Sequence, residues 1–214
     1  MENQTVESLP RLFCWTRFGG EAAEPVEHIL NRKEKERLAN GGIFMWGIGN
    51  AIGPSILELM QHTARPQVIF SPIKTEPKQK DVSPPAVVMW TEAEAIDGRR
   101  FAIPRHSLVT SRFDPETPKR HHFALVCYSA TPIVPLQRKF TIGFQQLSNL
   151  RTGRPVAASQ VTAIVERRDI EMESESVYDV AILAELIEPY FVILKNAQEV
   201  PVCRTTKSRV NDHA

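Results

Sequence analysis

The 214-residue sequence predicts an α+β protein with a bent mixed sheet, or a β-barrel, and flanking helices. About eight short segments rich in β-branched and aromatic residues are separated by turn signals, as in proteins built from short strands. Sixteen prolines favour short elements and loops over a helical bundle. The roughly two or three helical patterns fall mostly near the N-terminus and do not alternate with the strands, as a doubly wound parallel sheet requires.

The first part of the chain predicts the order strand, helix, strand, helix, strand. A strand over residues 12–18 ends at Gly19-Gly20, and a helix then begins at Pro25 and ends at Asn40-Gly41-Gly42. Within this helix, the charged run at 32–37 is typical of a solvated helix face. The next elements are a strand at 43–46, a short helix at 54–60 and a strand at 66–72.

The middle of the chain predicts further strands separated by turns. A polar, proline-rich loop spans residues 74–85, and Asp97-Gly98 is a strong turn signal. The expected strands cover residues 86–91, 101–104, 107–110, 121–128, 140–144 and 156–166.

The C-terminal part predicts a helix. Residues 176–186 carry apolar side chains at helical spacing, which indicates an amphipathic helix followed by a short apolar segment at 189–194. We therefore expect a main domain at residues 11–168 and a C-terminal extension at 169–214, made of this helix and a loose tail. The apolar stripe of the helix makes it a candidate docking or dimerisation element.

Charge and cysteine content limit the classes of function. A net charge of +1 gives no overall electrostatic case for nucleic acid, so any such case depends on local patches. No apolar run approaches the roughly 18 residues that span a bilayer, and the first residues carry no signal-peptide pattern. Cys14, Cys127 and Cys203 are widely spaced and favour a reducing, cytoplasmic location. We expect Cys14 and Cys127, which lie in apolar runs, to be core residues.

A glycine-rich corner joins the second expected strand to the second helix. Gly47, Gly49 and Gly53 form the pattern G-x-G-x-x-x-G, which lets the backbone approach a phosphate at a helix N-terminus. The third glycine is one position too late for a dinucleotide fingerprint, and residues 70–74 offer no acidic partner for a ribose. A nucleotide-cofactor enzyme using the Gly47–Gly53 corner remains an alternative.

Three tryptophans lie at or near the ends of expected strands, namely Trp15, Trp46 and Trp90. Each is compatible with a core position, but any two that converge on the glycine corner would form a slot for a flat base. Asn50 and Ser55 are placed to donate hydrogen bonds to the edge of such a base. A basic stretch could hold the phosphates, through Arg99, Arg100, Arg105, Arg112 and Arg120.

The order of these features resembles the PUA-like superfamily, especially its EVE and YTH branch. The similar part covers residues 11–168: a strand with Trp15, a charged helix, a strand ending in Trp46-Gly47-Ile48-Gly49-Asn50, a short helix and a set of curved strands. The resemblance implies a compact β-barrel with flanking helices and an aromatic pocket through which several members read modified bases in RNA or DNA. The chain departs from the family pattern after the first strand, where Lys-Ser-Glu-Pro is usual and Trp15-Thr16-Arg17-Phe18 leads into a different sequence.

The expected function is a nucleic-acid-binding module that recognises a modified or flipped base in an aromatic pocket. The expected partner is DNA or RNA and not a membrane. No catalytic motif is present, and adjacent His121 and His122 would point to opposite faces of a strand. We therefore assign no catalytic residue, metal or cofactor. The alternatives are the nucleotide-cofactor enzyme and a protein-interaction or dimerisation domain acting through the C-terminal helix.

Overall fold

A computed structural model describes residues 9–19, 25–48, 53–73, 86–111, 122–133, 141–157, 160–168 and 177–200. Its helices are α1 (Val26–Ala39), α2 (Gly53–His62) and the short 3-10 helix η1 (Phe144–Gln146). The strands of the first half are β1 (Leu12–Phe18), β2 (Ile43–Ile48), β3 (Gln67–Pro72), β4 (Ala86–Ala95), β5 (Arg100–Phe101) and β6 (Leu108–Ser111). Those of the second half are β7 (His122–Tyr128), β8 (Thr141–Gly143), β9 (Leu147–Asn149), β10 (Thr162–Arg167), β11 (Val177–Asp179) and β12 (Ile182–Glu199).

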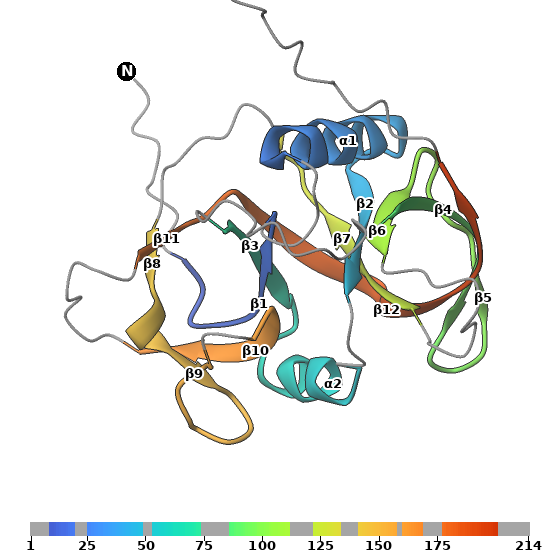
Figure 1. Ribbon diagram of the computed structural model, residues 1–214. Coiled ribbons are helices and arrows are strands. Elements are labelled where there is room, and N and C mark those ends of the chain that lie inside the picture. Colours follow the sequence, from blue (N-terminus) through green and yellow to red (C-terminus); the bar gives the residue numbers. More distant parts are fainter. Residues whose placement is uncertain are drawn as a thin grey trace, which may run out of the picture.

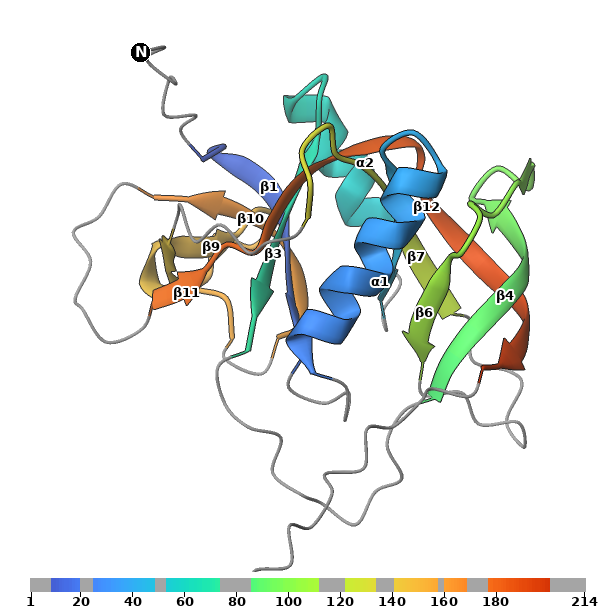
Figure 2. The same cartoon turned by 90° about the horizontal axis from the view of Figure 1, so that it is seen from above.

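The predicted α+β class with a bent mixed sheet is confirmed. Ten strands form one sheet in the order β2-β7-β12-β3-β1-β10-β9, and β4 branches from β12 and carries β5 and β6 (Figure 1). The sheet is mixed because β1 and β3 run parallel, whereas its other ladders are antiparallel. Figure 2 shows β12 running from the strands on one side of α1 to those on the other.

The 18-residue strand β12 is the element on which the sheet is built. Its first residues pair with β3, its middle pairs with β7 and its last residues pair with β4. Leu186 lies opposite Cys127 and Phe191 opposite Leu125, so residues 187–190 face Val126 alone. We call these residues the β12 bulge. It contains a cis Glu188–Pro189 bond, and Tyr190 has a φ of 63°.

The predicted C-terminal helix at 176–186 is wrong. This segment holds β11 and the start of β12, where Ile182, Ala184 and Leu186 are buried and the residues between them are half-buried. The half-buried residues Leu183 and Ile187 are also apolar and pack against the clusters of the opposite face, so the period of two is hidden beneath a pattern that also fits a helix. The segment proposed as a dimerisation helix is therefore not a helix. The described part of the expected extension instead supplies the strand that pairs with β3, β4 and β7.

Most other expected elements match the structure within a few residues, with one exception. The strand expected at 156–166 begins only at Thr162, because the Val156 N–H donates to the Leu147 carbonyl at 3.2 Å. This bond turns the chain back beside β9, in a segment for which the sequence predicts no definite secondary structure.

The buried side chains form three clusters. The helix-side cluster packs between the sheet and the two helices and contains Cys14, Phe18, Ile29, Leu30, Phe44, Trp46, Ile48, Ile56, Leu59, Val68, Phe70, Leu125, Cys127, Ile133, Ile164, Ile182, Ala184, Leu186 and Phe191. The β8-side cluster contains Leu9, Phe13, Trp15, Ile69, Ile142, Leu147, Val156, Ala163, Val165 and Val180. The β4-side cluster contains Met45, Val88, Trp90, Ala93, Val109, Ala124, Val126, Val192 and Leu194.

The expectation of a solvated charged face on α1 is wrong for part of the run at 32–37. Lys33, Glu36 and Arg37 are buried. Lys33 Nζ donates to Glu36 Oε2 at 2.8 Å and to the carbonyls of Met45 and Leu108, and Glu36 Oε1 accepts the Met45 N–H at 2.7 Å. These side chains therefore satisfy backbone groups of β2 and β6, which a hydrophobic side chain could not do.

Candidate functional site

The structure does not bring the three tryptophans together. Trp15 lies in the middle of β1, in the β8-side cluster, where its Nε1 donates to Ser71 Oγ at 3.1 Å. Trp90 lies within β4, in the β4-side cluster. Only Trp46 belongs to the helix-side cluster, near the end of β2 and next to the glycine corner. An aromatic pocket at the corner therefore has Trp46 as its tryptophan.

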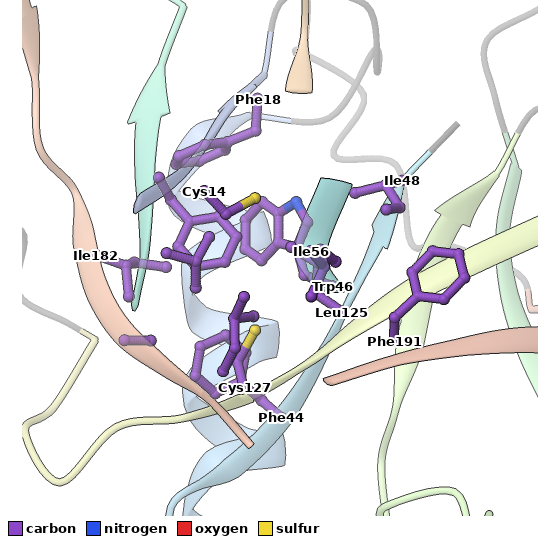
Figure 3. Close-up of a cluster of buried hydrophobic side chains, with 14 of the residues drawn as sticks. Cys14, Phe18, Phe44, Trp46, Ile48, Ile56, Leu125, Cys127, Ile182 and Phe191 are labelled. Atoms are coloured by element: carbon purple, nitrogen blue, oxygen red, sulfur yellow. The ribbon is translucent and has the colours of Figure 1, made fainter. Parts of the chain in front are cut away.

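Trp46 is the centre of a group of aromatic rings. Its ring centroid lies 5.1 Å from that of Phe18 in an edge-to-face arrangement, with an interplanar angle of 78°, and 4.3 Å from that of Phe70. Figure 3 shows Trp46 between Phe18 on one side and Phe44 on the other. The alternation along β2 produces this group, because Phe44, Trp46 and Ile48 point to the helix side and Met45 points to the opposite face.

The aromatic group is almost completely buried. Trp46 is 6% exposed, and Phe18 and Ile48 are each 7% exposed, whereas Phe44 and Phe70 are fully buried. Stacking of a planar ligand on the Trp46 ring would therefore require a neighbouring side chain to move.

Two further segments meet the end of β2. Ile48 lies opposite Phe123 on β7, and the Phe123 ring stacks on Phe191 with centroids 5.1 Å apart and an interplanar angle of 18°. Phe191 directly follows the β12 bulge, and Tyr190 within the bulge packs against the helix-side cluster. The bulge therefore packs against the cluster to which Trp46 belongs.

The polar residues predicted for the corner are only partly placed. Gly47 lies in β2 opposite Ala124, and Ser55 is half-buried in the first turn of α2, which has no acidic residue. Ile56, the next residue, packs in the same cluster as Trp46. Gly49 and Asn50 lie outside the described residues.

The predicted basic residues do not form one patch. Arg99 and Arg100 lie in the hairpin between β4 and β5, both exposed. Arg105 lies in the loop before β6, where its main chain exchanges two hydrogen bonds with the side chain of Asn40. Because Asn40 precedes β2 and Trp46 lies near the other end of that strand, Arg105 is remote from the aromatic group. Arg112 and Arg120 lie outside the described residues.

Arg99 links the β4–β5 hairpin to the β12 bulge. Its guanidinium lies 2.6 Å from Asp97 Oδ2 and 3.0 Å from Glu188 Oε1. Hydrogen bonds to Glu188 and then to Asp97 raise the pKa of Arg99, and the backbone and side-chain N–H groups of Arg99 lower the pKa of Asp97. A phosphate at Arg99 would have to compete with these two carboxylates, whereas Arg100 faces solvent beside them.

The β12 bulge was missed by reasoning from the sequence. The signal was Glu188-Pro189-Tyr190, a polar and proline-containing interruption of an apolar run. Such an interruption in a strand indicates a bulge or an edge. The apolar residues after Pro189 instead predict a separate short segment at 189–194.

A metal-binding cluster is not assembled in the described ranges. No three His, Cys, Asp or Glu residues lie close enough together there to hold a metal ion. Cys14 and Cys127 are free and buried, and burial raises the pKa of both thiols, to about 12 for Cys14. Among the described residues, no helix is long and apolar enough to cross a membrane.

Comparisons with known proteins do not extend this description. No protein-family profile matches the chain, and neither a curated protein nor a solved structure does.

Proposed function

We propose that the chain is a nucleic-acid-binding module that holds a modified or extruded base of DNA or RNA against Trp46. The observation that carries the proposal is the aromatic group near the end of β2, in which Trp46 packs against Phe18 and Phe70. Aromatic side chains bind bases of any sequence, because every base has a flat π-face. A base that has left its stack needs an aromatic surface of this kind to hold it.

A PUA-like barrel over residues 11–168 and a cytoplasmic location belong to the same proposal. In its support, β2 and β6 lie in contact at the two ends of the curved path β2-β7-β12-β4-β6, although no ladder joins these two described strands. The β4-side cluster fills the space inside this path. The contribution of β12 to the path extends the proposed unit beyond residue 168.

The phosphates of the bound strand would lie near Arg100 and Arg99. These residues belong to the hairpin that Arg99 joins to the β12 bulge, next to the region of Trp46. Since the net charge is only +1, we expect modest affinity with a shallow dependence on salt, set by one or two phosphate contacts.

Fluorescence anisotropy tests the proposal with labelled oligonucleotides of about 12 nucleotides, as single strands and as duplexes. The central position carries an unmodified base, 5-methylcytosine or N6-methyladenine, in both DNA and RNA. Binding is measured at about 50 and 150 mM salt, because affinity without a stated salt concentration cannot be interpreted. Absence of binding to every member of this panel would overturn the proposal.

The separate positions of the three tryptophans supply matched controls. Trp46→Phe should weaken binding about 5-fold, since phenylalanine keeps an aromatic ring and the loss should lie at the lower end of the roughly 1–3 kcal/mol measured for base–aromatic stacking. Trp15→Phe and Trp90→Phe alter rings that are buried in other clusters and should leave affinity unchanged. An equal loss in all three variants would indicate a general effect on folding instead of a site at Trp46.

A nucleotide cofactor at the Gly47–Gly53 corner is the competing function. Its support is the start of α2 at Gly53, with Ser55 in a first turn that lacks acidic residues. A ligand that binds only the folded state raises the melting temperature. A rise with a mononucleotide or dinucleotide, together with no oligonucleotide binding, would favour this function.

A further inference from the structure

We infer that the β12 bulge forms the second wall of the base-binding site and that the Tyr190 ring is its contact surface. The inference rests on the proposed function and adds a residue that no sequence motif indicated. Its starting point is the register of β12, in which residues 187–190 face only Val126. A bulge of this kind bends the strand and redirects a side chain, and bulges are frequent beside binding sites.

The backbone of Tyr190 is unusual for its residue type. Its φ of 63° lies in the left-handed region, which glycine and asparagine adopt far more readily than a bulky residue. Asn196 on the same strand, at φ 56°, is the ordinary case. Glycine at position 190 would adopt this left-handed conformation with less strain than tyrosine. The presence of tyrosine there therefore points to a use for its ring.

The position of Tyr190 fits a wall of the same site. It is half-buried and packs against the helix-side cluster, to which Trp46 and Ile48 belong. The neighbouring Phe191 is held by its stacking on Phe123, the residue opposite Ile48. The Tyr190 side chain is thus packed on its inner side against the helix-side cluster.

The ion pair between Arg99 and Glu188 ties the other end of the bulge to the β4–β5 hairpin. Hence the bulge is held between the aromatic group and two exposed arginines. A base attached to a phosphodiester matches this arrangement, with its ring at Tyr190 and its phosphate near Arg100. A neutral flat ligand would use only the first half of the site.

Tyr190→Gly separates a binding role from a packing role. Glycine relieves the backbone strain, but it removes the packing of the ring and adds entropy to the unfolded chain, so the melting temperature should fall modestly, and affinity is measured at a temperature at which the variant is fully folded. Affinity for the panel oligonucleotide that the wild type binds most tightly should fall roughly 5-fold to 150-fold, the range of one lost stacking contact. Tyr190→Phe keeps the ring and should bind like the wild type. Asn196→Gly is the matched control for glycine at a left-handed position of β12 and should leave affinity unchanged.

Three results would overturn the inference. If Trp46→Phe weakens binding and Tyr190→Gly does not, the inference fails while the proposed function stands. If the circular dichroism of Tyr190→Gly shows partial unfolding at the temperature of the binding assay and the loss of affinity follows the unfolded fraction, Tyr190 is a packing residue only. If the wild type binds no oligonucleotide of the panel, the proposed function fails and the inference fails with it.

Discussion

At the scale of single residues, burial decides the chemistry of the cysteines. Cys14 and Cys127 both lie within the helix-side cluster, where burial in an apolar environment disfavours the thiolate. The pKa of Cys14 rises from its ordinary 9.0 to about 12. Neither thiol is suited to act as a nucleophile, because the thiolate is the reactive form.

This pKa shift predicts lower stability at alkaline pH. Between pH 9 and about 12 the unfolded chain has lost the Cys14 proton while the folded chain still binds it. Stability therefore falls as pH rises through this window, by about 1.4 kcal/mol per pH unit for one such thiol, and is unaffected below pH 9. Urea unfolding of wild type and Cys14→Ala at several pH values measures the effect. The difference between the two free energies of unfolding should shift in favour of Cys14→Ala above pH 9, and a difference that stays constant with pH would contradict the assignment.

The tryptophans show which properties of a single residue the sequence predicts and which it does not. Their identity as large aromatic residues in strands was evident, but the cluster that each one joins depends on the face and the position of its strand in the bent sheet. Trp15 and Cys14 are adjacent and point to opposite faces, so one residue of register separates two clusters. No feature of the sequence near these residues distinguishes the faces.

At the scale of elements, the sequence predicts the bounds of α1 but not the burial of its charged side chains. Its bounds agree with the proline and glycine signals at its two ends. Its inner face carries Ile29 and Leu30 and then Lys33 and Glu36, which bond the backbone of Met45 on β2. A helix that covers a strand in this way also protects it from pairing with another chain.

Lys33→Met tests the importance of this buried pair. The substitution leaves the Glu36 carboxylate buried without its cation and the Met45 carbonyl without its lysine donor, while Arg32 still donates to the Leu108 carbonyl, so we expect a loss of about 3–5 kcal/mol in the free energy of unfolding. Lys35→Met changes an exposed residue of the same helix and should alter stability by about 0.5 kcal/mol or less. Chemical denaturation measures both. A small effect of Lys33→Met would mean that water or a side-chain shift replaces the lysine.

At the scale of the whole molecule, β12 pairs with strands of the main domain, although the sequence predicts that its residues belong to a separate extension. It pairs with strands from the first half and from the middle, so its backbone groups are satisfied only when both are in place. The expectation of an independent extension followed from the apparent helix at 176–186 and the loose tail expected after it. Long-range strand pairing carries no local sequence signal, which is why the division at residue 168 looked reasonable.

Truncation distinguishes a dispensable extension from an integral strand. A chain ending at residue 176 lacks β11 and β12, and it should lose cooperative unfolding because β3, β4 and β7 lose their common neighbour. A chain ending at residue 200 keeps every described element and serves as the control. Circular dichroism during heating measures both. Cooperative unfolding of the shorter chain would contradict the role assigned to β12.

The sequence by itself determined the fold class, most of the strands and both main helices, because these depend on local periodicity, prolines and glycines. It also placed Trp46 at the end of β2. Only the tertiary structure decided the separation of the three tryptophans, the burial of Lys33 and Glu36, and the β12 bulge, whose Glu188 pairs with Arg99. These features depend on which strands become neighbours and which face each one buries, and the pairing of β12 with β3, β7 and β4 settles both.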